Sequence, residues 1–267
     1  MFVIGERING MFKDIGDGIA AKDVKPVHAM AEKQLAGGAD ALDINVGTRV
    51  PKEERGEVMK WLVEATCEVT DKPLSIDNPS IDIVRAGIEA ADGKVKTIIN
   101  STTGQQDKLD AFMKLAADTG SSIIGLAIDE NGVASTADAK LEIGMRTIAA
   151  AMEVGLSPDE VYLDPIVLPV NCDQAAPMIV LETVAQFKML SDPAPHIVVG
   201  LSNLSQGALE RSLINKIFLT MAMAAGLDAS IHDPLDEELM NSMITAEVLL
   251  NNTIYSNSYI QAYRQSK

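Results

Sequence analysis

The stretch that decides the fold is LSIDNPSIDIVRAGIEAADGKVKTIIN, residues 74–100. It begins with a short apolar run, Leu74–Asp77, and ends with a second run, Val95–Asn100, which is rich in the β-branched residues typical of strands. Between the two runs, Asn78-Pro79 is read as a helix N-cap followed by proline at the first helical position, and a helical segment follows. We therefore predict a strand, a helix and a second strand, which together form the unit of a parallel sheet.

The same unit recurs along the whole chain. Six further strands are expected, with helical stretches between them: Phe2–Glu6, Ala41–Val46, Ser122–Ile128, Val161–Asp164, Ile197–Leu201 and Leu227–Ile231. Eight strand–helix units in roughly 250 residues, with no break in composition between them, are typical of a (β/α)8 TIM barrel. We predict one α/β barrel domain over residues 1–267. A doubly wound sheet is the main rival fold.

Apolar stripes and glycines mark several of the helices. Three stripes are expected to face the core: Leu109, Phe112 and Ala116; Leu141, Met145, Ile148 and Met152; and Ile214, Ile217 and Met221. Gly120, Gly155 and Gly226 stand where a left-handed residue is expected to end a helix.

Composition excludes several classes of protein. The 267 residues carry 22 Lys and Arg against 38 Asp and Glu, and the resulting net charge of −16 makes nucleic acid a poor partner. No segment has the roughly 18 uninterrupted apolar residues of a membrane span, and we expect no signal peptide in MFVIGERINGMF. Cys67 and Cys172 fit neither a disulfide framework nor a zinc pattern. We expect an acidic, cytoplasmic protein without a membrane partner.

Polar residues gather where the predicted strands end, which is where a (β/α)8 barrel carries its chemistry. These residues are Glu6, Asn9, Asp43, Asn45, Asp77, Asn100, Asp164, Ser202, Asn203, His232 and Asp233. Asp43 and Asn45 lie two positions apart on one strand, so both should point into the barrel. Any one Asp or Asn could be a helix N-cap, but six of the eight strands end in one of these residues. We therefore expect a shared pocket.

The residue types limit what this pocket can bind. The sequence has no phosphate-binding glycine loop, no dinucleotide fingerprint and no pair of histidines at ligand spacing, and we expect no metal in this chain. Asp and Asn offer acceptors and donors on flat groups, which suit a heterocycle with an amino-imine-carbonyl edge. A pterin or a purine has such an edge.

Several longer motifs resemble one known family. They are GERING (5–10), LDINVG (42–47), SIDNPS (75–80), IINSTTG (98–104), YLDPIVLPVN (162–171), KMLSDPAPHIVVGLSNLSQ (188–206) and RSLINKIFLTMAMAAGLDASI (211–231). The chain is similar, from Phe2 to about Tyr263, to the corrinoid-dependent methyltetrahydrofolate methyltransferases. These are pterin-binding (β/α)8 barrels of one-carbon metabolism. They move a methyl group between N5 of tetrahydrofolate and the cobalt of a corrinoid protein.

The resemblance implies a role for each matching residue. Asp77, Asn100 and Asp164 are expected to bind the pyrimidine edge of the pterin, and Asn203 is expected beside N5 as the catalytic residue. Further substrate-binding positions are Gly200, Ser202, Gln206 and Arg211, with Arg211 near the p-aminobenzoyl-glutamate tail. Two interpretations stay open for Glu6, Asn9, Asp43 and Asn45, which either take part in the site or form a network that braces the barrel mouth.

The resemblance also predicts the partners. The sequence has no Asp-x-His-x-x-Gly motif of a corrinoid-binding module, so a separate corrinoid protein is expected to supply the corrinoid. The folate, as tetrahydrofolate or its 5-methyl form, is the substrate or product, and the family predicts a homodimer. One alternative is a dihydropteroate synthase-like enzyme, but the Thr-Pro-Asp-Ser loop and the basic diphosphate-binding residues of those enzymes are missing. The other alternative is a non-catalytic pterin-binding subunit.

Overall fold

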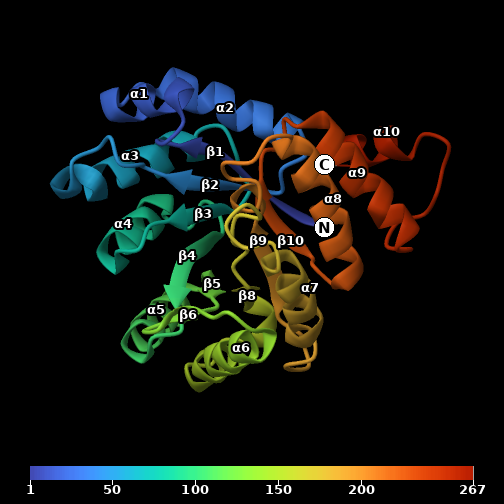
Figure 1. The fold of residues 1–267 in the computed structure, drawn as a ribbon. Helices are drawn as coiled ribbons and strands as arrows, with labels where there is room; N and C mark the ends of the chain where they lie inside the picture. The colour runs from blue at the N-terminus through green and yellow to red at the C-terminus, as the bar shows by residue number, and fades with distance from the viewer. Residues whose placement is uncertain (267) are drawn as a thin grey trace.

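The computed structural model describes residues 1–266, which form a closed barrel of eight parallel strands surrounded by helices (Figure 1). Around the barrel the strands follow the order β1-β10-β9-β8-β5-β4-β3-β2. The strands are β1 (Phe2–Asn9), β2 (Ala41–Asn45), β3 (Leu74–Asp77), β4 (Thr97–Thr103), β5 (Ser122–Leu126), β8 (Val161–Asp164), β9 (His196–Gly200) and β10 (Ala229–His232). The predicted (β/α)8 barrel is confirmed.

Helices cover the outside of the barrel and connect the strands. They are α1 (Lys13–Ala21), α2 (Val24–Ala36), α3 (Arg55–Cys67), α4 (Ile81–Ala91), α5 (Gln106–Thr119), α6 (Ala137–Glu153), α7 (Ala176–Phe187), α8 (Arg211–Ala225), α9 (Glu237–Leu249) and α10 (Tyr259–Gln265). An antiparallel pair, β6 (Ile128–Asp129) and β7 (Gly132–Val133), lies between β5 and α6. Short 3₁₀ helices are η1 (Lys52–Glu54), η2 (Pro158–Glu160) and η3 (Leu201–Asn203). No helix within residues 1–266 is long and apolar enough to cross a membrane.

The apolar residues form two separate cores. The larger core lies between the barrel wall and the helices. The smaller core fills the barrel interior with one buried residue from each of seven strands: Ile4, Ala41, Ile98, Ile124, Tyr162, Val198 and Ala229. Because successive residues of a strand point to opposite faces, the residue two positions after each of these also faces inward. This alternation fixes which strand-end residues reach the barrel mouth.

Two predicted strands are longer in the structure. β1 continues past Glu6 to Asn9, and β4 continues past Asn100 to Thr103. In both strands the pairing register shifts, between Gly5 and Ile8 in β1 and between Asn100 and Thr102 in β4. Pairing therefore resumes beyond an irregularity that the sequence pattern does not reveal.

The helix after β3 begins later than predicted. α4 starts at Ile81 with Ser80 as its N-cap, so Asn78-Pro79 does not open the helix. The Asn78 Oδ1 atom instead accepts a hydrogen bond of 3.0 Å from the Ser80 backbone nitrogen. Asn78 thus closes a turn that leads into the helix, a common use of asparagine.

Two of the three predicted stripes face the core only in part, through Leu141 and Ile148 on α6 and through Ile214 on α8. The stripe on α5 is buried, but Met145 and Met152 of α6 are exposed, as are Ile217 and Met221 of α8. The glycine predictions hold better. Gly120, Gly155 and Gly226 all have positive φ, and Gly120 and Gly226 are the C-cap residues of their helices.

Candidate functional site

A polar layer lies directly above the apolar interior, at the C-terminal ends of the strands. On β4 the interior residue Ile98 is followed two positions later by Asn100, and on β8 Tyr162 is followed by Asp164. The same spacing places Glu6 above Ile4 on β1. On each of these strands, the inward-facing residue that follows the apolar interior residue is polar. The predicted pocket residues are brought to one end of the barrel by this alternation.

Asp43 of β2 is buried and connects two neighbouring strands. Its Oδ1 atom accepts hydrogen bonds from the Ser75 Oγ atom on β3 at 2.7 Å and from the Asn100 Nδ2 atom on β4 at 3.0 Å. Burial raises the pKa of Asp43 well above its usual value, and the charge of Asp77 raises it further. The Nδ2 atom of Asn100 is bonded to Asp43 on β2, so the Oδ1 atom of Asn100 is turned away from β2. Asn100 thus presents an acceptor.

Asn45 holds Asp77 in a similar way. The Asn45 Nδ2 atom donates to the Asp77 Oδ2 atom at 2.6 Å, while its Oδ1 atom accepts from the Gly47 backbone nitrogen at 2.7 Å. Burial raises the pKa of Asp77, and the hydrogen bond from Asn45 opposes this rise. Within residues 1–266 the Oδ1 atom of Asp77 accepts no hydrogen bond. Asp77 therefore keeps a free acceptor beside that of Asn100, its register partner on β4.

Asp164 ends β8 on another side of the barrel. Its Oδ1 atom accepts a hydrogen bond of 2.7 Å from the Ile166 backbone nitrogen. Burial raises the pKa of Asp164 from 3.8 to about 6, while the Ile166 nitrogen, the charge of Lys140 and the Gly200 nitrogen oppose the rise. The carboxylate is thus held by backbone groups and lies in a nearly dry environment.

The turn after β9 places Asn203 over Gly200. A Cβ atom at position 200 would lie 3.0 Å from the Asn203 Nδ2 atom, so glycine leaves room for this amide. The side chain of Asn203 is exposed, and its carboxamide has no hydrogen-bond partner among the described residues. An amide that only capped the turn would bond to the turn's own backbone. This arrangement favours a group that is available to a ligand.

Ser202 and Arg211 brace the same turn. The Ser202 Oγ atom donates to Glu6 Oε1 at 2.7 Å. The Arg211 guanidinium donates to the Ser202 carbonyl oxygen at 3.1 Å and to the Ser205 Oγ atom at 3.2 Å. Burial raises the pKa of Glu6, with Asp233 adding to the rise, whereas the Ser202 hydroxyl and the nearby guanidinium groups lower it. Glu6 and Arg211 are therefore both hydrogen-bonded to the turn that carries Asn203.

Two of the polar strand-end residues, Asn9 and His232, make structural contacts of their own. The Asn9 Oδ1 atom accepts from the Met11 backbone nitrogen at 2.9 Å, which closes the loop after β1. His232 is buried against α9, where its Nε2 atom lies 3.4 Å from the Met240 Sδ atom. Gln206, a substrate-binding position implied by the resemblance, is exposed just beyond η3; its backbone nitrogen donates to the Asn203 carbonyl oxygen at 3.2 Å, and its side chain makes no hydrogen bond to residues 1–266. The structure thus places Asn9 and His232 in structural contacts.

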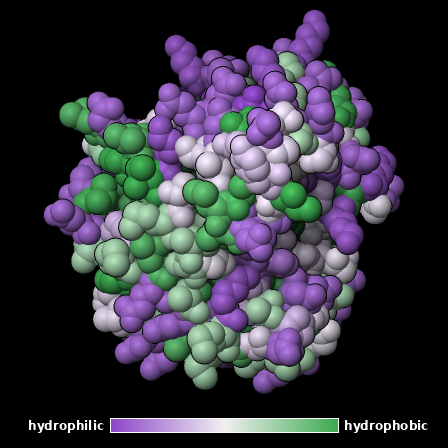
Figure 2. Space-filling view, turned by 90° about the vertical axis from the view of Figure 1, so that its right-hand side faces the viewer, coloured by the Kyte–Doolittle hydropathy of each residue, from purple (hydrophilic) through white to green (hydrophobic). Residues whose placement is uncertain are grey.

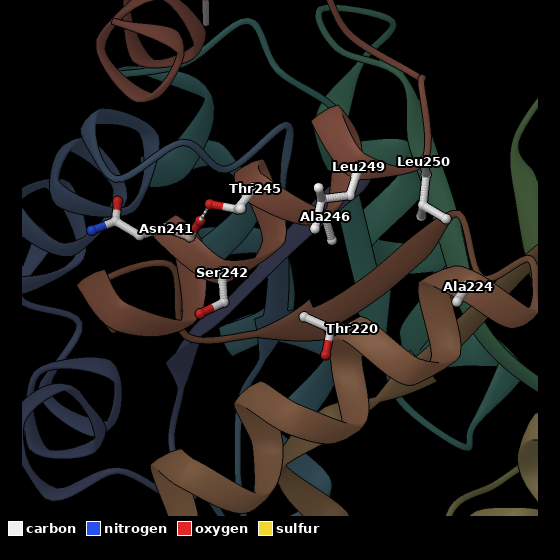
Figure 3. A pocket seen from close by; sticks show the side chains of 8 residues that line it. All are labelled: Thr220, Ala224, Asn241, Ser242, Thr245, Ala246, Leu249 and Leu250. Atoms are coloured by element: carbon white, nitrogen blue, oxygen red, sulfur yellow. Dashed lines mark hydrogen bonds between the residues drawn. The ribbon is translucent and has the colours of Figure 1, made fainter. Parts of the chain in front are cut away.

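The polar residues of the barrel mouth do not line a hollow found elsewhere in the described surface. That hollow, of about 490 Å³, lies between α8 and α9 (Figure 3). Its lining includes Thr220, Asn241 and Thr245, and the Thr245 hydroxyl donates to the Asn241 carbonyl oxygen at 2.7 Å. It contains no charged side chain. Among residues 1–266 there is also no group of three or more His, Cys, Asp or Glu placed to hold a metal ion.

Sequence reasoning missed three residues that support the site. Ser75 bonds to Asp43, Ile166 bonds to Asp164, and Lys140 donates to the carbonyl oxygens beside Ile166. Ser75 lies two positions before Asp77 on the same strand, so strand alternation could have found it. Lys140 carries no such signal because a lysine on a helix is normally exposed.

A parallel barrel with a polar layer at the C-terminal ends of its strands is the fold and site of a known family of enzymes. Residues 5–232 match the family of pterin binding enzymes, and the chain belongs to this family. The pterin-binding family that the sequence motifs imply is thereby confirmed.

Comparison with individual proteins gives more detail than the family match. The chain is 29% identical to a methylcorrinoid:tetrahydrofolate methyltransferase of Eubacterium limosum, over all of this chain and 97% of that protein. It is also 29% identical to a methionine synthase of Mycobacterium leprae, over 86% of this chain but only 20% of that much longer protein. Among solved structures, a Yersinia pestis dihydropteroate synthase in complex with a sulfonamide drug superimposes with a TM-score of 0.68 at 16% identity. That likeness covers 94% of both chains and shows the shared fold.

Proposed function

We propose that this protein is a methyltransferase that moves a methyl group between N5 of tetrahydrofolate and the cobalt of a corrinoid held by a separate protein. The observation that carries the proposal is the carboxamide of Asn203, which is unpartnered among residues 1–266 and held over Gly200. Across the same barrel mouth lie the free acceptors of Asp77 and Asn100. The full-length similarity to a methylcorrinoid:tetrahydrofolate methyltransferase supports this reading.

The pterin would be bound by its pyrimidine edge. Asp77 and Asp164 are proposed to accept N–H groups, and Asn100 offers its Oδ1 atom because Asp43 occupies its Nδ2 atom. Such a site rejects heterocycles that lack these donors, since its own buried groups would be left unpaired. Asp43 and Asn45 belong to the bracing network under this proposal, each holding one of the binding residues.

Asn203 is proposed to act on the transition state. Cleavage of the N5–methyl bond makes N5 more negative, and a carboxamide N–H can donate a hydrogen bond to it. Asn203 has no proton that titrates near neutral pH, so it would orient or stabilise rather than protonate N5 outright. By microscopic reversibility the same contact serves methyl transfer in either direction. Ser202 and Arg211 would contribute by holding the turn, and Gln206 by lining its outer wall.

The corrinoid protein would dock over the open end of the barrel. Three exposed apolar residues lie on loops at this end: Met11 after β1, Leu209 after β9 and Leu235 after β10. The loop after β9 also carries Asn203, and β10 is the neighbour of β9 in the barrel. Apolar side chains on a rim are typical of a protein–protein contact, whereas a folate site needs none there.

We further propose that residues 1–267 form one domain that acts as a cytoplasmic homodimer. Cys67 and Cys172 are free thiols, as expected in a reducing compartment. Hydrophobic areas interrupt the polar surface on the side that carries α8 and α9 (Figure 2). On α8 the apolar residues Leu213, Ile217 and Met221 are exposed. On a chain of net charge −16, an uncharged helix face is the surface where a second copy meets least repulsion.

The test is a single-turnover assay with 5-methyltetrahydrofolate and cob(I)alamin, in which formation of methylcobalamin is followed by absorbance. The wild-type chain should transfer the methyl group, and Asn203→Ala should slow the transfer by about 10²–10³-fold with a smaller loss of folate affinity. Ser191→Ala, on an exposed turn at the other end of β9, is the matched control. Folate binding without any transfer would favour a non-catalytic pterin-binding subunit. A slow rate that follows only from a lowered melting temperature would make Asn203 a structural residue.

A further inference from the structure

The carboxylate of Asp164 depends on a backbone turn in an unfavourable conformation. Ile166 has a φ of 54°, in the left-handed region that β-branched residues rarely adopt. Such a conformation is unfavourable and persists only when its surroundings hold it. In this conformation the Ile166 backbone nitrogen donates to the Asp164 Oδ1 atom at 2.7 Å.

The group that holds the turn is a buried lysine. Lys140, in the first turns of α6, is only 3% exposed. Its Nζ atom donates to the Pro165 carbonyl oxygen at 2.5 Å and lies 3.4 Å from the Ile166 carbonyl oxygen. Within the described residues no carboxylate forms an ion pair with Lys140. Burying an ammonium without a paired charge is unfavourable, and burial accordingly lowers the pKa of Lys140.

A stability role alone does not account for this arrangement. The same helix position filled by an apolar residue would avoid the cost of burying a charge. What the ammonium adds is a pair of hydrogen bonds to the two carbonyl groups that flank the strained residue. These bonds keep the turn closed, and the closed turn aims the Ile166 N–H at Asp164.

We propose that Lys140 is a positioning residue for substrate binding, which holds the Pro165–Ile166 turn so that the Asp164 carboxylate faces the pterin. This inference rests on the proposed function. Without the ammonium, both carbonyl oxygens lose their donor and Ile166 can relax toward an extended φ. The Asp164 carboxylate then loses its backbone donor and its fixed orientation. Lys140 touches no substrate and acts through the turn, while its charge also stabilises the ionised Asp164 carboxylate.

Loss of Lys140 should change KM and kcat in a way that distinguishes positioning of Asp164 from a role in stability alone. Asp164 is proposed to bind the pyrimidine edge, away from the methyl group, so its contact is equally strong in the ground state and the transition state. Loss of such a contact raises KM and leaves kcat nearly unchanged. A lysine that only stabilised the fold would instead lower the active fraction, and therefore the apparent kcat, with KM unchanged.

The test compares Lys140→Met with Lys188→Met in binding and turnover. Lys188 is a matched control because it also donates to a proline carbonyl oxygen, that of Pro195 at 3.0 Å, but at the opposite end of the barrel. Calorimetric titration with 5-methyltetrahydrofolate should show a Kd about tenfold higher for Lys140→Met, with KM raised in parallel. Lys188→Met should lower the melting temperature and leave Kd within twofold.

The outcomes of this test distinguish a failure of the inference from a failure of the proposed function. If the wild type does not bind 5-methyltetrahydrofolate, the proposed function is wrong and this inference falls with it. If the wild type binds and Lys140→Met binds equally well, the inference alone is overturned. Should Lys140→Met fail to fold, Lys140→Leu, which also removes the donor, takes its place. A Kd for that variant within threefold of wild type overturns the inference, and a larger rise supports it.

Discussion

Replacing Asp164 with asparagine is expected to stabilise the folded protein at neutral pH while weakening folate binding. Burial raises the pKa of this carboxyl from 3.8 to about 6, so the ionised form is unfavourable in the folded state. At about 1.36 kcal/mol for each tenfold change in acidity, this corresponds to about 3 kcal/mol. Asparagine has nearly the same shape, keeps an oxygen that can accept from the Ile166 nitrogen, and carries no charge to bury.

The sign of the pH dependence follows from the direction of the shift. A carboxyl whose folded pKa is raised destabilises the folded state above that pKa, and the penalty disappears as the pH falls below the unfolded value of 3.8. The advantage of Asp164→Asn should therefore be about 3 kcal/mol at pH 7.5 and about half of that at pH 5. All other titrating groups are common to both proteins, so the difference isolates Asp164.

Urea unfolding at the two pH values measures this difference, with Asp71→Asn on the exposed surface as the control that should change stability by less than about 0.5 kcal/mol. Calorimetry at pH 7.5 should show a roughly tenfold or larger rise in the folate Kd of Asp164→Asn, because a charged acceptor is lost. The reasoning is refuted if the variant is destabilised by the same amount at both pH values. That result would mean that the charge of Asp164 is well solvated or well paired in the free protein.

Three further predictions concern other parts of the molecule. Asn100→Ala should weaken folate binding by about 1–3 kcal/mol with the fold intact, which calorimetry and circular dichroism check together; an unchanged Kd would remove Asn100 from the pterin edge. Leu209→Asp should slow methyl transfer to a corrinoid protein but not to free cob(I)alamin, because only the protein contacts the rim; equal slowing of both would contradict the docking surface. Asp228→Ala should cost on the order of 1–2 kcal/mol at pH 7, since this carboxylate accepts from Lys188 at 2.6 Å and from His196 at 2.8 Å. Although burial opposes the shift, these contacts lower the pKa of Asp228, so the cost should fade as the pH drops through that lowered value.

The sequence predicts the barrel and the polar strand ends for the same physical reason. Strands buried on both faces read as short apolar runs, and a polar residue at the end of such a run cannot be part of the apolar core. Leu74–Asp77 and Val161–Asp164 were therefore predicted with the bounds that the structure shows. The position of Asp164 at the barrel mouth follows directly from the end of its strand.

Packing against neighbouring elements is what the sequence pattern does not contain. On α6 the stripe with Met145 and Met152 was expected inside, yet the buried face carries smaller residues such as Gly144 and Ala151. A Cβ atom at Gly144 would lie 2.6 Å from the Phe187 ring, so the helix approaches α7 too closely for larger side chains. The helix is apolar on several sides, and the distance to its neighbour decides which side is buried. For the same reason the burial of Lys140 depends on a loop that lies 25 residues away in the sequence.

The carboxylates at the two ends of the barrel differ in the direction of their pKa shifts, and this contrast supports the proposed site without reference to any relative. At the N-terminal end, Asp228 is paired with a lysine and a histidine, and its pKa is lowered, so its charge stabilises the fold. At the C-terminal end, burial raises the pKa values of Asp43, Asp77 and Asp164, and no cation forms a salt bridge with them among residues 1–266. Charges that destabilise the free protein need a compensating partner, and a bound heterocycle with several N–H donors supplies one. Because a ligand that binds only the folded state adds stability, the carboxylates are costly only while the site is empty.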